Sequence, residues 1–224
     1  MNKNIIEVTH GNSIGSFYVR DNTLDNFIVN SIWKNNEYFY REINIEPGNV
    51  VVDIGCHVGA FSILAAKKGA SKVLSFEPLQ ENYNSFIDNI ELNNVTDIVK
   101  PFNKAVYYSN NDVFINHGTV SGNETGSSFL SNSGEIKVET ITLNNILKDL
   151  ETCDFLKIDC EGSEYNILKN SDLSKVKKIS MEVHKRDRNN EIITHLFDRG
   201  FELVHFAQTK TLGILKAMKV GYTK

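Results

Sequence analysis

Apolar runs alternate with amphipathic stretches along most of this chain, which predicts strands separated by helices. Residues 50–52 are three consecutive valines and predict a buried strand. Residues 60–68 repeat apolar side chains at helical spacing, and the following Gly69 is a common helix stop. Residues 72–76 predict the next strand. This order of strand, helix and strand indicates one unit of a parallel sheet.

The same alternation continues toward the end of the chain. Residues 79–92 are amphipathic and predict a helix, and Thr142 is expected to cap another one. Residues 201–206 and 211–218 predict a closing antiparallel pair of strands. Further strands are expected at residues 95–99, 103–107, 135–141, 155–158 and 177–183, and a further helix at residues 190–199. The chain shows no internal repeat and no linker.

The N-terminal residues predict a small addition to this α/β unit. Residues 1–20 indicate a short β element, and residues 25–45 indicate a helical stretch with Phe27, Ile28, Ile32 and Trp33 on one side. We expect residues 1–46 to form a β/helical cap near the carboxyl edge of the sheet.

The cap brings three further residues near the expected ligand site. Glu37, Tyr38 and Tyr40 then either line the site or pack as surface aromatics. We expect residues 47–224 to form a single compact unit.

Residues 109–134 differ in composition from the rest of the chain, because they are rich in Asn, Ser and Gly. Long irregular loops in compact domains are usually functional or disordered. We expect a loop on the substrate side, and a floppy insertion is the alternative.

Two glycines and two acids in the first unit follow a nucleoside-binding pattern. Gly55 and Gly59 form a G-x-x-x-G turn, and Asp53 stands just before it. Glu77 ends the second strand, and a carboxylate about 20 residues beyond a glycine turn can accept both ribose hydroxyls. Asp53 would repel a pyrophosphate but attract an ammonium or a sulfonium. The pattern therefore favours S-adenosylmethionine over NAD. The alternative is an ordinary turn with loop glycines and a solvated acid.

Neighbouring residues extend this expected cofactor site. Cys56 and His57 lie inside the turn, and Pro78 follows the acidic strand end. Asn103 and Ala105 follow a later strand, where a Rossmann-like methyl-transfer domain would place the adenine. The small Ala105 would let a flat ring lie close to the backbone.

Candidate catalytic residues follow two other strands. Asp159 and Glu161 come after residues 155–158, and His184 comes after residues 177–183. Ligands bind at the carboxyl ends of parallel strands, so these side chains are expected to meet. An alkyl hydroxyl is a poor nucleophile, and a nearby base helps its methylation. We expect one of the three to be that base, with Asp159 best placed and also near the cofactor.

Two alternatives remain open for this group. Glu164 either borders the reacting centre or serves as a helix-start carboxylate favoured by the helix dipole. Together with Glu182, the same acids and His184 offer oxygen and imidazole ligands for a divalent ion. We expect a metal-free site.

The chain resembles the FkbM family of S-adenosylmethionine-dependent methyltransferases over roughly residues 37–184. The order and spacing of its motifs match that family, and IDCEGSE is the most specific of them. The matching pieces are PGNVVVDIGCHVGAFSILAA, SFEPLQENYNSFIDNIELNN, NKAV, VETITLNNIL, FLKIDCEGSEYNIL and ISMEVH. Two departures are Cys56-His57, where the family usually has Ala-Asn, and Asn144, where it usually has Asp.

The resemblance implies a Rossmann-like class I methyltransferase sandwich in the α/β class. Its seven-stranded, mostly parallel sheet would have the order 3-2-1-4-5-7-6 with helices on both faces. It also implies methylation of a hydroxyl, often on a sugar or natural product. By position, the resemblance implies that Asp53, Gly55 and Gly59 form the methionine side of the cofactor site. It implies a ribose contact at Glu77 and an adenine border at residues 103–105. It also implies that Asp159, Glu161 and Glu164 border the reacting centre.

Composition limits the competing functions. The 224 residues carry a net charge of −4, which disfavours a general nucleic-acid binder. The three cysteines lack metal-ligand spacing and, with no apparent signal peptide or membrane span, indicate a reducing, cytoplasmic compartment. We expect O-methylation of a glycan or small-molecule hydroxyl. An RNA methyltransferase and a non-catalytic S-adenosylmethionine-binding protein are the alternatives.

Overall fold

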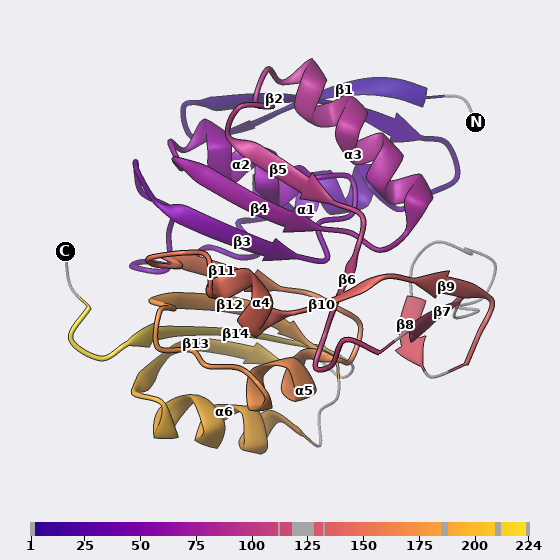
Figure 1. The fold of residues 1–224 in the computed structure, drawn as a ribbon. Coiled ribbons are helices and arrows are strands. Elements are labelled where there is room, and N and C mark those ends of the chain that lie inside the picture. Colours follow the sequence, from indigo (N-terminus) through magenta and orange to yellow (C-terminus); the bar gives the residue numbers. More distant parts are fainter. Residues whose placement is uncertain are drawn as a thin grey trace.

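The structure, a computed structural model, describes residues 3–111, 113–117, 128–131, 133–184, 188–208 and 212–222 (Figure 1). Among these residues, no helix combines the length and the apolar character that crossing a bilayer requires. Within the loop expected at residues 109–134, residues 112, 118–127 and 132 lie outside the described residues.

A seven-stranded sheet forms the centre of the molecule. Its strand order is β13–β14–β12–β11–β3–β4–β5, and every pair is parallel except those made by β14. This is the expected order 3-2-1-4-5-7-6 read from the other edge, so the predicted fold is confirmed. The strands are β3 Val50–Ile54, β4 Lys72–Phe76, β5 Val99–Phe102, β11 Phe155–Ile158, β12 Lys178–Val183, β13 Phe201–Gln208 and β14 Gly213–Lys219.

Helices cover both faces of this sheet because successive strand residues point to opposite sides. Val51 packs with α1, α2 and α3 in one core, whereas Val52 packs with α4, α5 and α6 in the other. Both cores are apolar, which accounts for the continuous hydrophobic runs of the strands. The helices are α1 Asp25–Asn35, α2 Ala60–Lys67, α3 Gln80–Leu92, α4 Leu143–Leu147, α5 Glu164–Lys169 and α6 Asn189–Asp198.

A polar row crosses the face that carries α1 and α2. Adjacent strands align Ser75, Asp53, Lys157, Ser180, Lys216 and His205 in register. This row lies directly below the carboxyl ends of the parallel strands, so it forms the floor of the region where ligands bind in such sheets.

The N-terminal residues form a third layer outside the helices. The antiparallel hairpin of β1 Lys3–His10 and β2 Ser13–Arg20 lies alongside α3 (Figure 1). The Trp33 indole donates a hydrogen bond to the carbonyl of Ala60 at 3.0 Å, which fixes α1 against the start of α2. The predicted β element at residues 1–20 is therefore present, and its status as a separate cap remains a prediction.

Part of the expected loop region forms a small sheet beside the main one (Figure 1). Strands β7 Val113–His117, β8 Ser128–Ser131 and β9 Ile136–Val138 are antiparallel, with β7 in the centre. Next to them, β6 Ala105–Tyr107 pairs in parallel with β10 Thr140–Thr142. The strand predicted at residues 135–141 is thus two strands that belong to different sheets.

The helix predicted at residues 25–45 was wrong beyond Asn35. Asn36 adopts a left-handed conformation with φ of 57°, which ends the helix, and the following residues form a turn. Phe27 was also misplaced, because its side chain is 69% exposed whereas Trp33 is buried. The segment predicted as a strand at residues 95–99 forms turns up to Ile98, and β5 begins at Val99.

Candidate active site

The two glycines of the G-x-x-x-G turn are required by protein packing. Gly55 has φ of 75°, and a Cβ there would lie 1.7 Å from the carbonyl oxygen of Asp159. Gly59 has φ of 86°, and a Cβ there would lie 2.1 Å from the ring of Phe86 on α3. A side chain at position 55 would therefore push β3 away from β11, and one at position 59 would push α3 away from the turn.

Asp53 lies beneath the turn and is completely buried. Its carboxylate accepts a hydrogen bond from Ser62 at 2.6 Å and lies 3.3 Å from the Lys157 ammonium. Burial raises the pKa of Asp53, and Lys157 opposes that shift. Lys157 also donates to the Gly55 carbonyl at 2.6 Å, so this ion pair supports the turn from below. Contact of Asp53 with the cofactor remains a prediction.

Glu77 holds the turn from the opposite side. One oxygen accepts the backbone N–H of His57 at 2.9 Å, and the other accepts the N–H of Leu79 at 2.9 Å. Burial raises the pKa of Glu77 to about 7, although these hydrogen bonds favour the ionised form. The side chain is therefore fixed at the end of β4 in the position that the sequence predicts for a ribose contact.

His57 occupies the middle of the turn with φ of 51°, which is unusual for a residue with a side chain. Its ring is buried against Asp25, whose carboxylate forms a bidentate pair with Arg20. Burial lowers the pKa of His57 to about 4, so the ring is neutral and the 3.8 Å approach to Asp25 is not an ion pair. Neither ring nitrogen has a hydrogen-bond partner among the described residues.

The residues expected at the adenine end are engaged within the protein. Asn103 donates to the carbonyls of Glu77 at 2.9 Å and Pro78 at 3.2 Å, so it connects the ends of β5 and β4. The buried Ala105 donates its backbone N–H to Glu139. The thiol of Cys56 is also buried, and burial raises its pKa well above the ordinary range. Cofactor contacts of these residues remain predictions.

These residues fit a cationic nucleoside better than a dinucleotide. Asp53 and Glu77 are carboxylates on either side of the turn, and a pyrophosphate placed between them would be repelled. His57 adds two buried nitrogens that need a hydrogen-bond partner. A ribose and an α-amino acid end would satisfy such groups, so the geometry fits S-adenosylmethionine.

A second group of polar side chains meets at the ends of β11 and β12. Ligand atoms of Asp159, Glu182 and His184 all lie within 4.8 Å of one another. The Nε2 atom of His184 lies 3.1 Å from Glu161, 3.4 Å from Glu182 and 4.0 Å from Asp159. The structure therefore brings together the three predicted catalytic residues, Asp159, Glu161 and His184.

Glu161 and Glu164 hold His184 in a fixed position. The Nδ1 atom of His184 lies 2.8 Å from the buried carboxylate of Glu164, which also accepts the N–H of Gly162. Burial alone would lower the pKa of His184, but hydrogen bonds to the two glutamates raise it to about 11. His184 is thus an imidazolium near neutral pH. Glu161 itself has φ of 54°, a strained conformation that often marks functional sites.

Tyr38 and Lys157 reach Asp159 from two other parts of the chain. The Tyr38 hydroxyl donates to the Asp159 carboxylate at 2.9 Å, and the Lys157 ammonium lies 3.7 Å from it. Burial alone would lower the pKa of Lys157, but the charges of Asp53 and Asp159 raise it. The positively charged Lys157 therefore lies between the glycine turn and the carboxylate of Asp159.

Glu182 was predicted only as a possible metal ligand and not as a proton acceptor. Burial, followed by the charge of Asp159, raises the pKa of Glu182 to about 8. The available signal was the alternation of β12, which places Glu182 on the same sheet face as Ser180. Lys157 was missed because it reads as one polar residue within an apolar strand.

Asn144, where the chain departs from the FkbM pattern, connects two elements away from this site. Its amide donates to the Asn170 carbonyl and accepts the N–H of Asp172. Thr142 accepts the N–H of Asn145 and caps α4 as predicted.

Several curated proteins are similar in sequence to this chain. Methyltransferase sdnD of Sordaria araneosa is 25% identical over 190 residues, covering 70% of this chain and 73% of that protein. Methyltransferase 1 of Beauveria bassiana is 24% identical and covers 61% and 67% of the two chains. AMB antimetabolite synthetase AmbE of Pseudomonas aeruginosa is 28% identical over 75% of this chain, but the match spans 11% of that protein.

Solved structures share the fold at low identity. TrmK of M. capricolum in complex with S-adenosyl-homocysteine has a TM-score of 0.53 and 12% identity, covering 80% of this chain and 66% of that one. Ribosomal protein L11 methylase of Lactobacillus delbrueckii subsp. bulgaricus has a TM-score of 0.50 and 16% identity, covering 80% and 73%. Both structures resemble this chain in their fold, which is the Rossmann-like methyltransferase fold.

The model of the methyltransferase FkbM domain matches residues 53–203. The match begins at Asp53, the buried aspartate below the glycine turn, and it includes Asp159, Glu161, Glu182 and His184. It spans most of the 224 residues. This chain therefore belongs to the FkbM family of methyltransferases.

Proposed function

We propose that this member of the FkbM family methylates a hydroxyl group on a sugar or a small natural product. Membership in the family makes the chain an S-adenosylmethionine-dependent methyltransferase. The single observation that carries the proposal of a hydroxyl acceptor is the half-buried pair of carboxylates, Asp159 and Glu182, at the carboxyl ends of β11 and β12. Such a pair supplies the proton acceptor that a hydroxyl needs.

Several side chains of this protein would hold the cofactor. Glu77 would accept the ribose hydroxyls, His57 would offer its unpartnered nitrogens to the methionine end, and residues 103–105 would border the adenine. When bound, S-adenosylmethionine supplies an electrophilic methyl group for in-line displacement. The chain then contributes by orienting the acceptor hydroxyl and receiving its proton.

The two carboxylates are the proton acceptor in this proposal. Burial, followed by the charge of Asp159, raises the pKa of Glu182 to about 8, which is close to the pH at which an enzyme works. His184 is already protonated, and we propose that it positions Glu161 and stabilises the pair electrostatically.

The same carboxylates argue for a small acceptor over a nucleic acid. Glu37, Asp159, Glu161 and Glu182 surround the reacting edge, and their charges would repel a phosphate backbone. We further propose a reducing, cytoplasmic location, because all three cysteines are free and two of them are buried.

The test is a pair of substitutions that separate binding from turnover. Glu77→Ala should weaken S-adenosylmethionine binding measured by calorimetry, whereas Asp159→Asn should leave it nearly unchanged. Asp159→Asn should lower methyl transfer to sugar hydroxyls by about 100-fold or more. Unchanged turnover of Asp159→Asn would remove Asp159 from the catalytic group. No binding of S-adenosylmethionine by the wild type would contradict the proposed cofactor.

A chelator tests the expectation of a metal-free site. Asp159, Glu182 and His184 have the spacing of metal ligands, but both His184 nitrogens already contact glutamates. Turnover should therefore persist in EDTA. Loss of turnover that added Mg²⁺ or Zn²⁺ restores would assign a metal to this group.

A further inference from the structure

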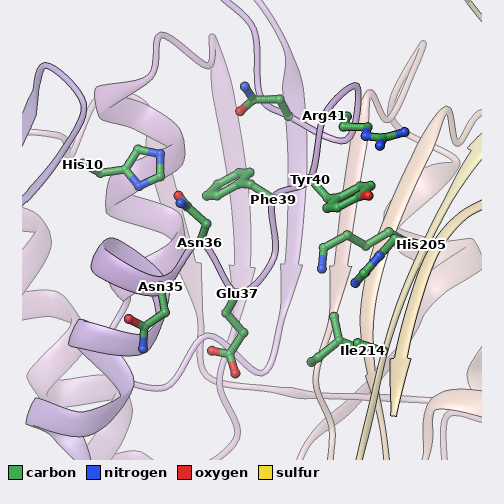
Figure 2. A pocket seen from close by; sticks show the side chains of 12 residues that line it. His10, Asn35, Asn36, Glu37, Phe39, Tyr40, Arg41, His205 and Ile214 are labelled. Atoms are coloured by element: carbon green, nitrogen blue, oxygen red, sulfur yellow. The ribbon is translucent and has the colours of Figure 1, made fainter.

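A cavity of about 630 Å³ opens close to Asp159, between the turn after α1 and the strands β13 and β14. Figure 2 shows Glu37 at one end of it and His205 and Ile214 along the strands opposite. Six lining residues carry the argument, namely Glu37, Tyr40, Arg41, His205, Ile214 and Lys216. The proposed function assigns no role to this cavity.

Lys216 is the most unusual residue of the lining. It is 4% exposed, and its ammonium makes no hydrogen bond or ion pair within the described part of the chain. Burial lowers the pKa of Lys216 to about 8, and the charge of Glu37 opposes that shift. An ammonium that lines a cavity and has no partner within the described residues is available to pair with an anionic ligand in that cavity.

The cavity has a cationic, aromatic wall beside Lys216. The rings of Tyr40 and His205 stack with centroids 4.2 Å apart, and the Arg41 guanidinium lies 5.1 Å from the Tyr40 ring. Burial, then the charges of Lys216 and Arg41, lower the pKa of His205. This wall offers a flat surface and positive charge to an anionic group.

The other end of the cavity is acidic and adjoins the reacting edge. Glu37 lines the cavity, and burial together with the charge of Asp159 raises its pKa. Its neighbour Tyr38 donates to Asp159 at 2.9 Å. A hydroxyl at this end would therefore lie next to the proposed proton acceptor.

The sheet register sets the distance between the two ends. Lys216 pairs with Ser180, and Ser180 pairs with Lys157 two residues before Asp159. Only β12 separates the two outer strands, so their backbones are about 10 Å apart. A ligand of one or two sugar-sized units would span this distance.

We propose that the cavity binds the methyl acceptor, and that this acceptor is a small hydroxyl compound carrying a carboxylate or a phosphate. The anionic group pairs with Lys216 and Arg41, and a hydroxyl at the Glu37 end points toward Asp159 and Glu182. The inference rests on the proposed hydroxyl methylation and adds the acidic group that selects the acceptor.

Binding of simple probes tests the charge requirement without turnover. Glucuronate, glucose 6-phosphate, glucose and inorganic phosphate are titrated by calorimetry into the full chain saturated with S-adenosylhomocysteine. We expect glucuronate or glucose 6-phosphate to bind measurably better than glucose, and the stronger of the two identifies the anionic group. Inorganic phosphate shows whether the anion binds without the polyol.

Substitution of Lys216 locates the binding. Lys216→Met removes the ammonium and retains most of the unbranched side chain, and we expect it to weaken binding of the acidic sugar by about tenfold or more. Lys72→Met is the matched control, because Lys72 is exposed at the far end of β4, and it should change binding by less than about twofold. Thermal unfolding of both variants verifies that they fold.

The outcomes separate this inference from the proposed function. Equal binding of glucose and the acids, no binding of either acid, or unchanged affinity in Lys216→Met would overturn the inference. Methylation of the acidic sugar at wild-type rate by Lys216→Met would overturn it while leaving the proposed function intact. Binding of S-adenosylmethionine without methylation of any hydroxyl would instead count against the proposed function.

Discussion

Two halves of the carboxyl edge of the sheet are built in different ways. The half at β3, β4 and β5 uses residues close together in the chain, such as His57 and Glu77, which are 20 residues apart. The half at β11, β12 and β14 uses residues far apart, such as Tyr38 and Asp159, which are 121 residues apart. The cofactor half is therefore a local motif, whereas the reacting half depends on the whole fold.

Lys157 connects the two halves. Its ammonium lies 3.3 Å from Asp53 under the cofactor turn and 3.7 Å from Asp159 at the reacting edge. It also donates to the carbonyl of Gly55. The two halves are consequently coupled through one buried charge, and substitutions there should affect both of them.

The largest effect is expected from Lys157→Met. This change leaves Asp53 as an unpaired buried charge, and loss of one partner of a buried pair costs roughly 3–5 kcal/mol of the free energy of unfolding. Urea unfolding measures the loss, with Lys72→Met as the control. Addition of Asp53→Asn should restore most of the stability. A double variant as unstable as Lys157→Met alone would mean that the pair is not the cause.

Glu77→Gln should change how the free energy of unfolding depends on pH. Burial raises the pKa of Glu77 from 4.5 to about 7, so the folded chain holds this proton more tightly than the unfolded chain. The resulting stability is complete below about pH 4.5 and is lost as the pH rises through about 7. The change is on the order of 3 kcal/mol.

Urea unfolding between about pH 5 and pH 8 tests this prediction. Glu77→Gln should remove this part of the pH dependence, whereas Glu81→Gln, at an exposed acid in the first turn of α3, should retain it. Identical slopes for Glu77→Gln and the wild type would show that Glu77 titrates at an ordinary pKa in the folded chain.

Two glycine substitutions compare the energetic cost of backbone strain alone with the added cost of a steric clash between the glycine turn and Asp159. Gly48→Ala introduces a side chain at φ of 86° with nothing within 4 Å, so only the strain of about 1–2 kcal/mol applies. Gly55→Ala has a similar φ of 75° but meets the backbone of Asp159. It should cost about 1–3 kcal/mol more in the free energy of unfolding. Equal costs would indicate that β11 can move away from the turn.

The smallest effect is expected from Tyr38→Phe. It removes one hydrogen bond to Asp159, which is worth about 1 kcal/mol, so turnover should fall by a few fold while S-adenosylmethionine affinity stays unchanged. Tyr40→Phe is the control, because it keeps the stacking on His205. A larger loss in Tyr40→Phe than in Tyr38→Phe would indicate that the Tyr40 hydroxyl, and not the hydrogen bond from Tyr38 to Asp159, matters for turnover.

The sequence predicted the local elements of the cofactor half closely. The strand at residues 72–76 has the predicted bounds, and the helix after the glycine turn ends one residue earlier than expected. Predictions were poorer where tertiary contacts decide the structure. Residues 36–45 are polar and aromatic at helical spacing, yet a left-handed Asn36 turns them toward the sheet edge.

The class of fold, the glycine turn and the acids at the strand ends could all be predicted from the order of residues alone. These features depend on alternation, turn chemistry and the periodicity of side chains, which act within a few residues. The support of the turn by Lys157, the protonation of His184 and the position of Lys216 at a cavity, without a partner among the described residues, follow from the tertiary structure. Those properties depend on burial and on charges brought together across the sheet, and neither can be read from neighbouring residues.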